Sequence, residues 1–344
     1  MNYSFAREIE LRGPGPMGHK AISLPHRWIT RFSLVAILVG MAGASATIAA
    51  CNTLPNQLAL HEDQLIHVPS QRVVPYESLR RALLAADVIY LGEEHYTPSH
   101  IQAAIHVLTA LIEAGKRPTL ALEMFSWDSQ EALDGWLRGG IPTEDQFLAA
   151  AHWKENWGGD YRAYKPLISF ARRHRIPVYG LNPPRSLVRL VAKQGLDRAL
   201  QDPAMTRWSI GFIPRDDPNY RNILFEQIQA CHPNLPQDTY ERLYEASLFR
   251  DEGMATVIKA YLRRRAHDEG PLVSYTGSGH IQYGVPVPAR VKRDLPFSID
   301  DLAVYLMSFD PTRQRDIQNV MEKGIADYLW LTAPGPRGIQ QRCG

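Results

Sequence analysis

The sequence is poor in cysteine and has no excess of either charge. Its 344 residues include three cysteines, and no Cys-x-x-Cys pair or Cys/His spacing typical of a zinc site occurs. The first fifty residues hold five Lys/Arg and two Asp/Glu, which leaves 33 basic and 34 acidic residues in the rest. Proteins that bind nucleic acid usually carry a basic surface. We therefore expect no nucleic-acid partner.

Two further patterns are missing. The sequence contains no internal repeat. The stretch "TGSGH" (276–280) lacks the G-x-S-x-G spacing of a serine nucleophile elbow, so serine-nucleophile hydrolysis of that type is not expected.

The front of the chain has the features of an export signal. A basic stretch with no acid after Glu10 precedes the uncharged run "FSLVAILVGMAGASATIAA", and Met17 would serve as a start that leaves a signal of ordinary length. The residues "IAAC" before and at Cys51 resemble the lipobox of bacterial lipoproteins. We predict a signal peptide over 1–50 and lipidation at Cys51, with an uncleaved membrane anchor as the alternative. Because Asn52 is not the inner-membrane retention aspartate of enteric bacteria, we expect anchoring on the periplasmic side of the outer membrane.

The rest of the chain alternates strands and helices. A polar, proline-containing tether is predicted over 51–75, an α/β domain over 76–334 and a C-terminal tail over 335–344. Helical spacing is evident after the first strand, and helices are expected near 129–138, 143–151 and 161–175. This order predicts a mostly parallel sheet with helices on both faces, and a helical insertion at about 184–266 between the third and fourth strands. The expected strands are 87–92, 117–125, 176–182, 270–280 and 326–333.

Polar side chains follow the ends of four of these strands. Ligands of open parallel sheets bind outside the carboxyl ends of the strands, where loops and helix N-termini converge. A carboxylate flanked by Leu122 and Met124 is costly to bury without a partner. The sequence therefore predicts one site at this edge of the sheet, made by Glu93, His95, Glu123 and His280, with Asn182 nearby.

Each of these residues also has an ordinary explanation. Glu123 could form a salt bridge with an arginine, and either histidine could be a plain loop residue. Glu94 should point away from Glu93, because successive strand residues face opposite sides, and we expect it to face solvent.

Several motifs resemble those of the ChaN-type haem-binding lipoproteins, a family similar to the Tiki proteases and erythromycin esterases. The resemblance extends from about 87 to 333 and rests on motifs that occur in order. They are "LGEEH", "LEMF", "NWGGDYRAYKPLISFAR", "IPVYGLNPPRSLV", "LFRDEGMA" and "YTGSGHIQYGVP".

The resemblance implies haem binding in bacterial iron uptake or storage, with haem at a homodimer interface and its iron ligated by tyrosine. Phenolate is a hard anionic ligand suited to ferric iron. Tyr244 and His232 match the family pattern best and are the first candidates, and Tyr220 is the next candidate ligand. His232 or a nearby arginine such as Arg242 could hold the haem propionates.

A different class of function competes with haem binding. Glu93, His95, Glu123 and His280 could bind a divalent metal ion or activate water, as in a hydrolase of the Tiki or erythromycin esterase type. The two functions use different residues, so both could exist in one protein.

Overall fold

The computed structural model describes residues 60–208, 210, 212, 214–266, 269–336 and 338–339. The predicted signal peptide, Cys51 and the first part of the predicted tether lie outside the described residues. Within the described part of the chain, no helix is long and apolar enough to cross a membrane.

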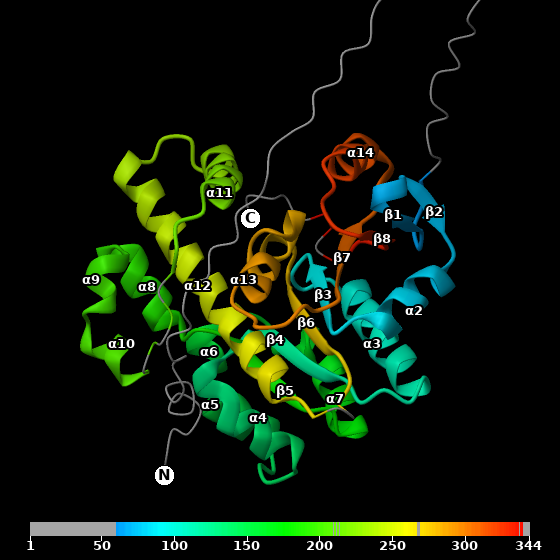
Figure 1. Ribbon diagram of the computed structural model, residues 1–344. Helices are drawn as coiled ribbons and strands as arrows, with labels where there is room; N and C mark the ends of the chain where they lie inside the picture. The colour runs from blue at the N-terminus through cyan, green and yellow to red at the C-terminus, as the bar shows by residue number, and fades with distance from the viewer. Residues whose placement is uncertain are drawn as a thin grey trace, which may run out of the picture. The chain divides into compact units, whose positions relative to one another are not determined.

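One sheet of eight strands forms the centre of the described body (Figure 1). Its order is β2-β1-β8-β7-β3-β6-β4-β5, and all pairs from β8 to β5 are parallel, whereas β1 is antiparallel to β2 and β8. The predicted α/β class with a mostly parallel sheet is confirmed. The strands are β1 (Leu65–His67), β2 (Arg72–Val74), β3 (Val88–Glu93), β4 (Thr119–Ser126), β5 (Val178–Asn182), β6 (Leu272–Gly277), β7 (Asp301–Ser308) and β8 (Tyr328–Thr332).

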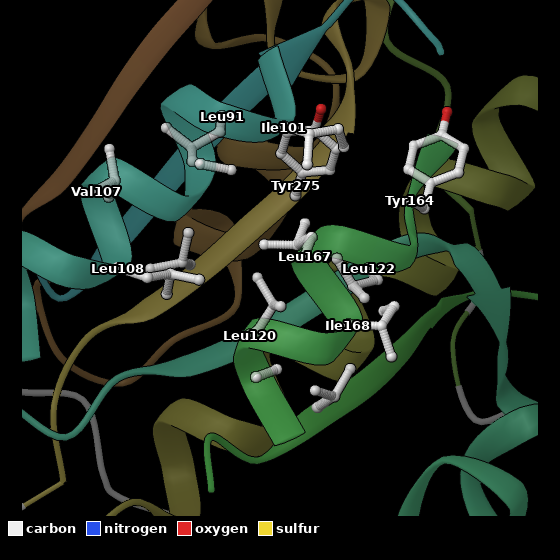
Figure 2. Packing of buried hydrophobic residues seen from close by; sticks show 14 of the residues in the cluster. Leu91, Ile101, Val107, Leu108, Leu120, Leu122, Tyr164, Leu167, Ile168 and Tyr275 are labelled. Atoms are coloured by element: carbon white, nitrogen blue, oxygen red, sulfur yellow. The ribbon is translucent and has the colours of Figure 1, made fainter. Parts of the chain in front are cut away.

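Helices cover both faces of the sheet, because alternate side chains of its buried strands point to opposite sides. On one face Leu91 and Tyr275 join a large apolar cluster, part of which Figure 2 shows. On the other face Val88 and Tyr90 join a second cluster. The first face is covered by α2 (Tyr76–Ala85), α3 (Pro98–Glu113), α4 (Gln130–Leu137) and α7 (Lys165–His174), and the second by α12 (Gln237–Arg264) and α13 (Val287–Arg293).

The helical insertion is present where it was predicted, between β5 and β6. No described residue between these strands belongs to a strand. The long helix α12 crosses the sheet, and its N-terminal part packs against α11 through Tyr220, Tyr244 and Leu248. The insertion consists of α8 (Arg185–Gln194), α9 (Leu196–Leu200), α10 (Pro203–Arg207), α11 (Pro218–Cys231) and α12. The remaining helices are α5 (Glu144–Ala150), α6 (Trp153–Asn156) and α14 (Gln314–Glu322).

Two predictions about the sheet need correction. The tether predicted over 51–75 is wrong from Leu65 onward, since β1 pairs with β8 and buries Leu65 and Ile66. Strands of three residues are too short to produce a readable alternation of apolar and polar positions. The strand β7 was also missed; it is a continuous apolar run, and such a run fits a buried helix as well as a buried strand.

Candidate active site at the strand ends

Glu93, His95, Glu123 and His280 form what we call the strand-end cluster. Glu93 is the last residue of β3, Glu123 lies near the end of β4, and His280 follows β6. His280 Nε2 lies 3.5 Å from Glu123 Oε1, and His95 Nδ1 lies 2.8 Å from Glu93 Oε1. The parallel sheet therefore brings together the side chains that the sequence pattern predicts to meet.

Gly277 lies where the two halves of the cluster meet. Its backbone N–H donates to Glu123 Oε2 at 2.5 Å. A Cβ atom at this position would lie 2.9 Å from the His95 ring and 3.4 Å from Glu123 Oε2. Any larger residue would push His95 away, so the glycine permits the histidine to approach Glu123.

Glu93 is completely enclosed and hydrogen-bonded. The hydroxyl groups of Tyr164 and Tyr275 donate to its carboxylate oxygens at 2.9 and 2.7 Å. In Figure 2 these two rings point their hydroxyl groups the same way, toward one end of the apolar cluster. Burial opposes protonation of His95, but the hydrogen bond with Glu93 prevails and raises the pKa of His95. Glu93 thus orients His95 and favours its charged form.

The fully buried Glu123 forms an ion pair with the partly buried Arg250 of α12. Arg250 Nε also donates to Asn182 Oδ1 at 2.9 Å, and Asn182 Nδ2 donates to the backbone oxygen of Glu123 at 2.8 Å. Burial would raise the pKa of Glu123, yet the Arg250 and His280 charges hold that pKa well below its usual range. The arginine salt bridge expected as the ordinary explanation is present, and it belongs to the same cluster.

His280 has its own carboxylate partner, the fully buried Asp251 of α12. His280 Nδ1 lies 2.5 Å from Asp251 Oδ1. Although burial opposes it, the charges of Asp251 and Glu123 raise the pKa of His280 to about 9. The protonated imidazole of His280 is therefore favoured at neutral pH, and its Nε2–H group faces Glu123.

The cluster does not fit a metal ion. Among the described residues, no three His, Cys, Asp or Glu side chains are placed to hold one. The carboxylate of Glu93 is occupied by His95 and two tyrosine hydroxyls, and that of Glu123 by Arg250 and Gly277. The predicted metal site at these four residues is therefore not supported by their arrangement.

The prediction that Glu94 faces solvent is wrong. Glu94 does point away from Glu93, but its carboxylate pairs with Arg313 at 2.9 Å and accepts from the Ser308 backbone N–H at 3.2 Å. Its own N–H donates to Nδ1 of His100, and burial lowers the pKa of that imidazole to about 3. Glu94 joins the ends of β3 and β7, a role hidden from the sequence because β7 was not predicted.

Four residues of the site were missed by sequence reasoning. Tyr164 and Tyr275 carry aromatic side chains that look like ordinary core, and they are core except for their hydroxyl groups. Arg250 and Asp251 lie in "LFRDEGMA", where a charged triplet interrupts a run of buried apolar residues on α12. That interruption was the available signal.

Tyrosines of the helical insertion

The tyrosines of the insertion lie between α11 and α12. The hydroxyl of Tyr244 donates to Asp216 Oδ1 at 2.8 Å, and the Arg221 guanidinium lies 4.2 Å from the ring centroid. The hydroxyl of Tyr220 donates to Asp251 Oδ2 at 2.5 Å. Burial raises the pKa of Tyr244 to about 12 and that of Tyr220 well above its usual value.

The other predicted haem contacts lie apart from these hydroxyl groups. His232 is exposed at the end of α11, and its backbone oxygen accepts the hydroxyl of Tyr240. The partly buried Arg242 pairs with the exposed Asp238 of α12 at 2.7 Å.

Comparison with known proteins identifies the family. The sequence model of the family described as haem-binding uptake, Tiki superfamily, ChaN matches residues 79–291. The chain belongs to this family. The match covers every residue of the strand-end cluster and the tyrosines of the insertion.

The individual relatives share less than a third of their residues with this chain. A structure of ChaN from Campylobacter jejuni, described as showing cofacial haem binding, has a TM-score of 0.59 at 20% identity and covers 78% of this chain and 98% of that one. Protein RETICULATA-RELATED 5, chloroplastic, from Arabidopsis thaliana is 28% identical over 273 residues, which are 74% of this chain. The match spans 35% of that longer protein. The erythromycin esterase EreC has a TM-score of 0.40 at 13% identity, covering 72% of this chain and 76% of that one.

Proposed function

We propose that the protein is a haem-binding lipoprotein that acts in bacterial haem or iron uptake or storage. Membership of the haem-binding uptake family supports the ligand, and the tyrosines between α11 and α12 supply a suitable iron donor. The observation that carries the proposal is the environment of Tyr244, whose hydroxyl has a carboxylate beside it and a guanidinium on its ring.

Tyr244 fits the role of iron ligand chemically. Bound haem would supply a ferric iron that takes a phenolate oxygen. Burial and the Asp216 carboxylate, which accepts the hydrogen bond of the Tyr244 hydroxyl, raise the pKa of Tyr244, whereas the Arg221 charge favours the phenolate. Ferric iron would therefore have to displace the phenol proton on binding. The side chains of Asp216 and Arg221 contact the hydroxyl and the ring in this structure, so a ligand must displace them. The hydroxyl of Tyr220, in contrast, is committed to the buried Asp251.

A homodimer with haem at its interface and an N-terminal lipid complete the proposal. The Campylobacter jejuni relative is described as binding haem cofacially, which places two macrocycles face to face. Two chains presenting such faces would cover apolar haem surface that one chain leaves in water. Acyl chains on Cys51 would hold the protein at the outer membrane.

The test of this proposal is a haemin titration of the full-length chain in detergent, followed by optical spectroscopy and sedimentation. We expect saturable binding, a high-spin tyrosinate-type spectrum, and dimer formation on loading. Absence of binding at micromolar haemin would contradict the proposal.

The lipid anchor has its own test. The substitution Cys51→Ala should release the protein from membranes or leave an uncleaved precursor. An unchanged mass and unchanged membrane partitioning would rule out lipidation.

A second candidate function is hydrolysis at the strand-end cluster. It is favoured by one observation, the two imidazole–carboxylate pairs, His95–Glu93 and His280–Asp251, on either side of Gly277. A protonated histidine oriented by a carboxylate can act as a general acid toward a leaving group. Ester or amide turnover that is lost in His280→Gln and insensitive to chelators would support this function. Equal turnover by the wild type and His280→Gln would exclude hydrolysis at this cluster.

A further inference from the structure

Two hydrogen bonds and an ion pair join the insertion to the strand-end cluster. The hydroxyl of Tyr220 on α11 donates to Oδ2 of Asp251 on α12 at 2.5 Å. The other oxygen of Asp251 meets His280 Nδ1 at 2.5 Å, and His280 Nε2 lies 3.5 Å from Glu123 Oε1. The two groups of residues that lie far apart in the sequence are therefore linked through one carboxylate.

Asp251 depends on both of its partners. Its side chain is completely buried, and a buried carboxylate is costly unless both oxygens are hydrogen-bonded. One oxygen is bonded by Tyr220 and the other by His280. Loss of either donor must therefore change how Asp251 is held, and with it the position of the remaining partner.

Tyr220 lies on a helix, α11, that buries little of its surface. It is the one fully buried residue among the described residues of α11, and its contacts with Tyr244 and Leu248 form a small apolar cluster separate from the main core. A helix attached through so little buried surface can separate from its neighbours at modest cost.

We propose that Asp251 couples the helical insertion to the strand-end cluster. While Tyr220 is bonded to Asp251, the carboxylate holds the His280 ring in line with Glu123. A ligand that displaces α11 or takes the Tyr220 hydroxyl removes one donor from Asp251, which then reorients and shifts His280. By linkage, a change at His280 alters the affinity of the insertion for that ligand. That the ligand is haem rests on the proposed function, whereas the coupling does not.

The first experiment tests the coupling without any ligand. Imidazole ¹⁵N resonances are recorded for the full-length chain, with His280 assigned by its loss in His280→Gln. In Tyr220→Phe we expect the His280 Nδ1 resonance to move by more than its line width. Tyr240→Phe is the matched control, because Tyr240 is an equally buried tyrosine of the insertion whose hydroxyl bonds a backbone oxygen. An unmoved His280 resonance in Tyr220→Phe, or an equal shift in both variants, would overturn the coupling.

The second experiment adds gallium protoporphyrin, a diamagnetic counterpart of ferric haem, to the wild type. A shift of His280 in the direction seen for Tyr220→Phe supports ligand-driven coupling. Saturable binding with no shift of His280 overturns the ligand-driven part. Absence of porphyrin binding, with the Tyr220→Phe shift present, overturns the haem function and leaves the coupling supported.

Discussion

The strand-end cluster and the α11–α12 tyrosines contain similar polar side chains but are held in different ways. In the cluster, a second side chain orients each of three residues through a hydrogen bond: Glu93 orients His95, Asp251 orients His280, and Asn182 orients Arg250. The tyrosines instead lie between two helices in a cluster with few buried members, and Asp216 beside Tyr244 is largely exposed.

This difference indicates which region can accept a large ligand. Side chains at the ends of parallel strands are held in place by the hydrogen-bonded sheet. Displacing one of them leaves a buried charge without a partner. The contact between α11 and α12 can open while the sheet stays intact. Chemistry on a small group suits the first region, and uptake of a macrocycle suits the second.

The largest effect is expected for Glu123→Gln. The substitution leaves Arg250 and His280 without their shared anion, and loss of one partner of a buried pair costs about 3 kcal/mol or more of unfolding free energy. Urea denaturation measures this loss. The control is Glu77→Gln, which removes the exposed pair with Arg80 and should barely move the midpoint. Similar midpoints for the two variants would show that the cluster is not held as described.

The pH dependence of stability should report on the His280–Asp251 pair of the strand-end cluster. The pKa of His280 is raised to about 9 in the folded state, so its stabilisation is fully present below about pH 6.5 and is lost as pH rises through about 9. The difference from the unfolded value corresponds to about 3 kcal/mol. Urea unfolding across this range should reveal the decline in the wild type and a flatter profile in His280→Gln. Identical slopes would assign the decline to other groups.

Much of this arrangement could be predicted from the sequence, for a clear reason. Glu93 and Gly277 end buried parallel strands and Glu123 lies near the end of another, and the carboxyl ends of such strands meet at one edge. Local patterns of apolar residues locate the strands, and that geometric rule then brings their terminal carboxylates and histidines together.

The remaining parts depend on contacts that local patterns do not specify. Helix α12 has 28 residues, and although the charged triplet at 250–252 marks buried polar positions, it does not tell which strand ends Arg250 and Asp251 reach. The burial of the Tyr220 and Tyr244 hydroxyl groups likewise depends on how α11 docks. Glu94 was misassigned because its partner Arg313 follows the unpredicted strand β7.

A smaller effect is expected on ligand binding in the insertion. Tyr244→Phe should weaken haemin binding by about tenfold and remove the tyrosinate charge-transfer band, because the iron loses its phenolate donor. Tyr240→Phe serves as the control, since it removes a hydroxyl from the same insertion without touching Asp216. If Tyr240→Phe has the larger effect, or if the spectrum of Tyr244→Phe is unchanged, the ligand is not Tyr244.

The smallest effect is expected at the outer side of α12. Arg242 pairs with the exposed Asp238 one turn earlier, so Arg242→Gln should leave the urea midpoint within error. If Arg242 instead turns to a haem propionate, the substitution weakens haemin binding by roughly threefold, as for other exposed ion pairs. The salt dependence of the titration distinguishes the two cases, because only a propionate contact makes wild-type affinity fall with ionic strength more steeply than that of Arg242→Gln. Parallel salt curves would place the propionates elsewhere and leave Arg242 with its Asp238 pair alone.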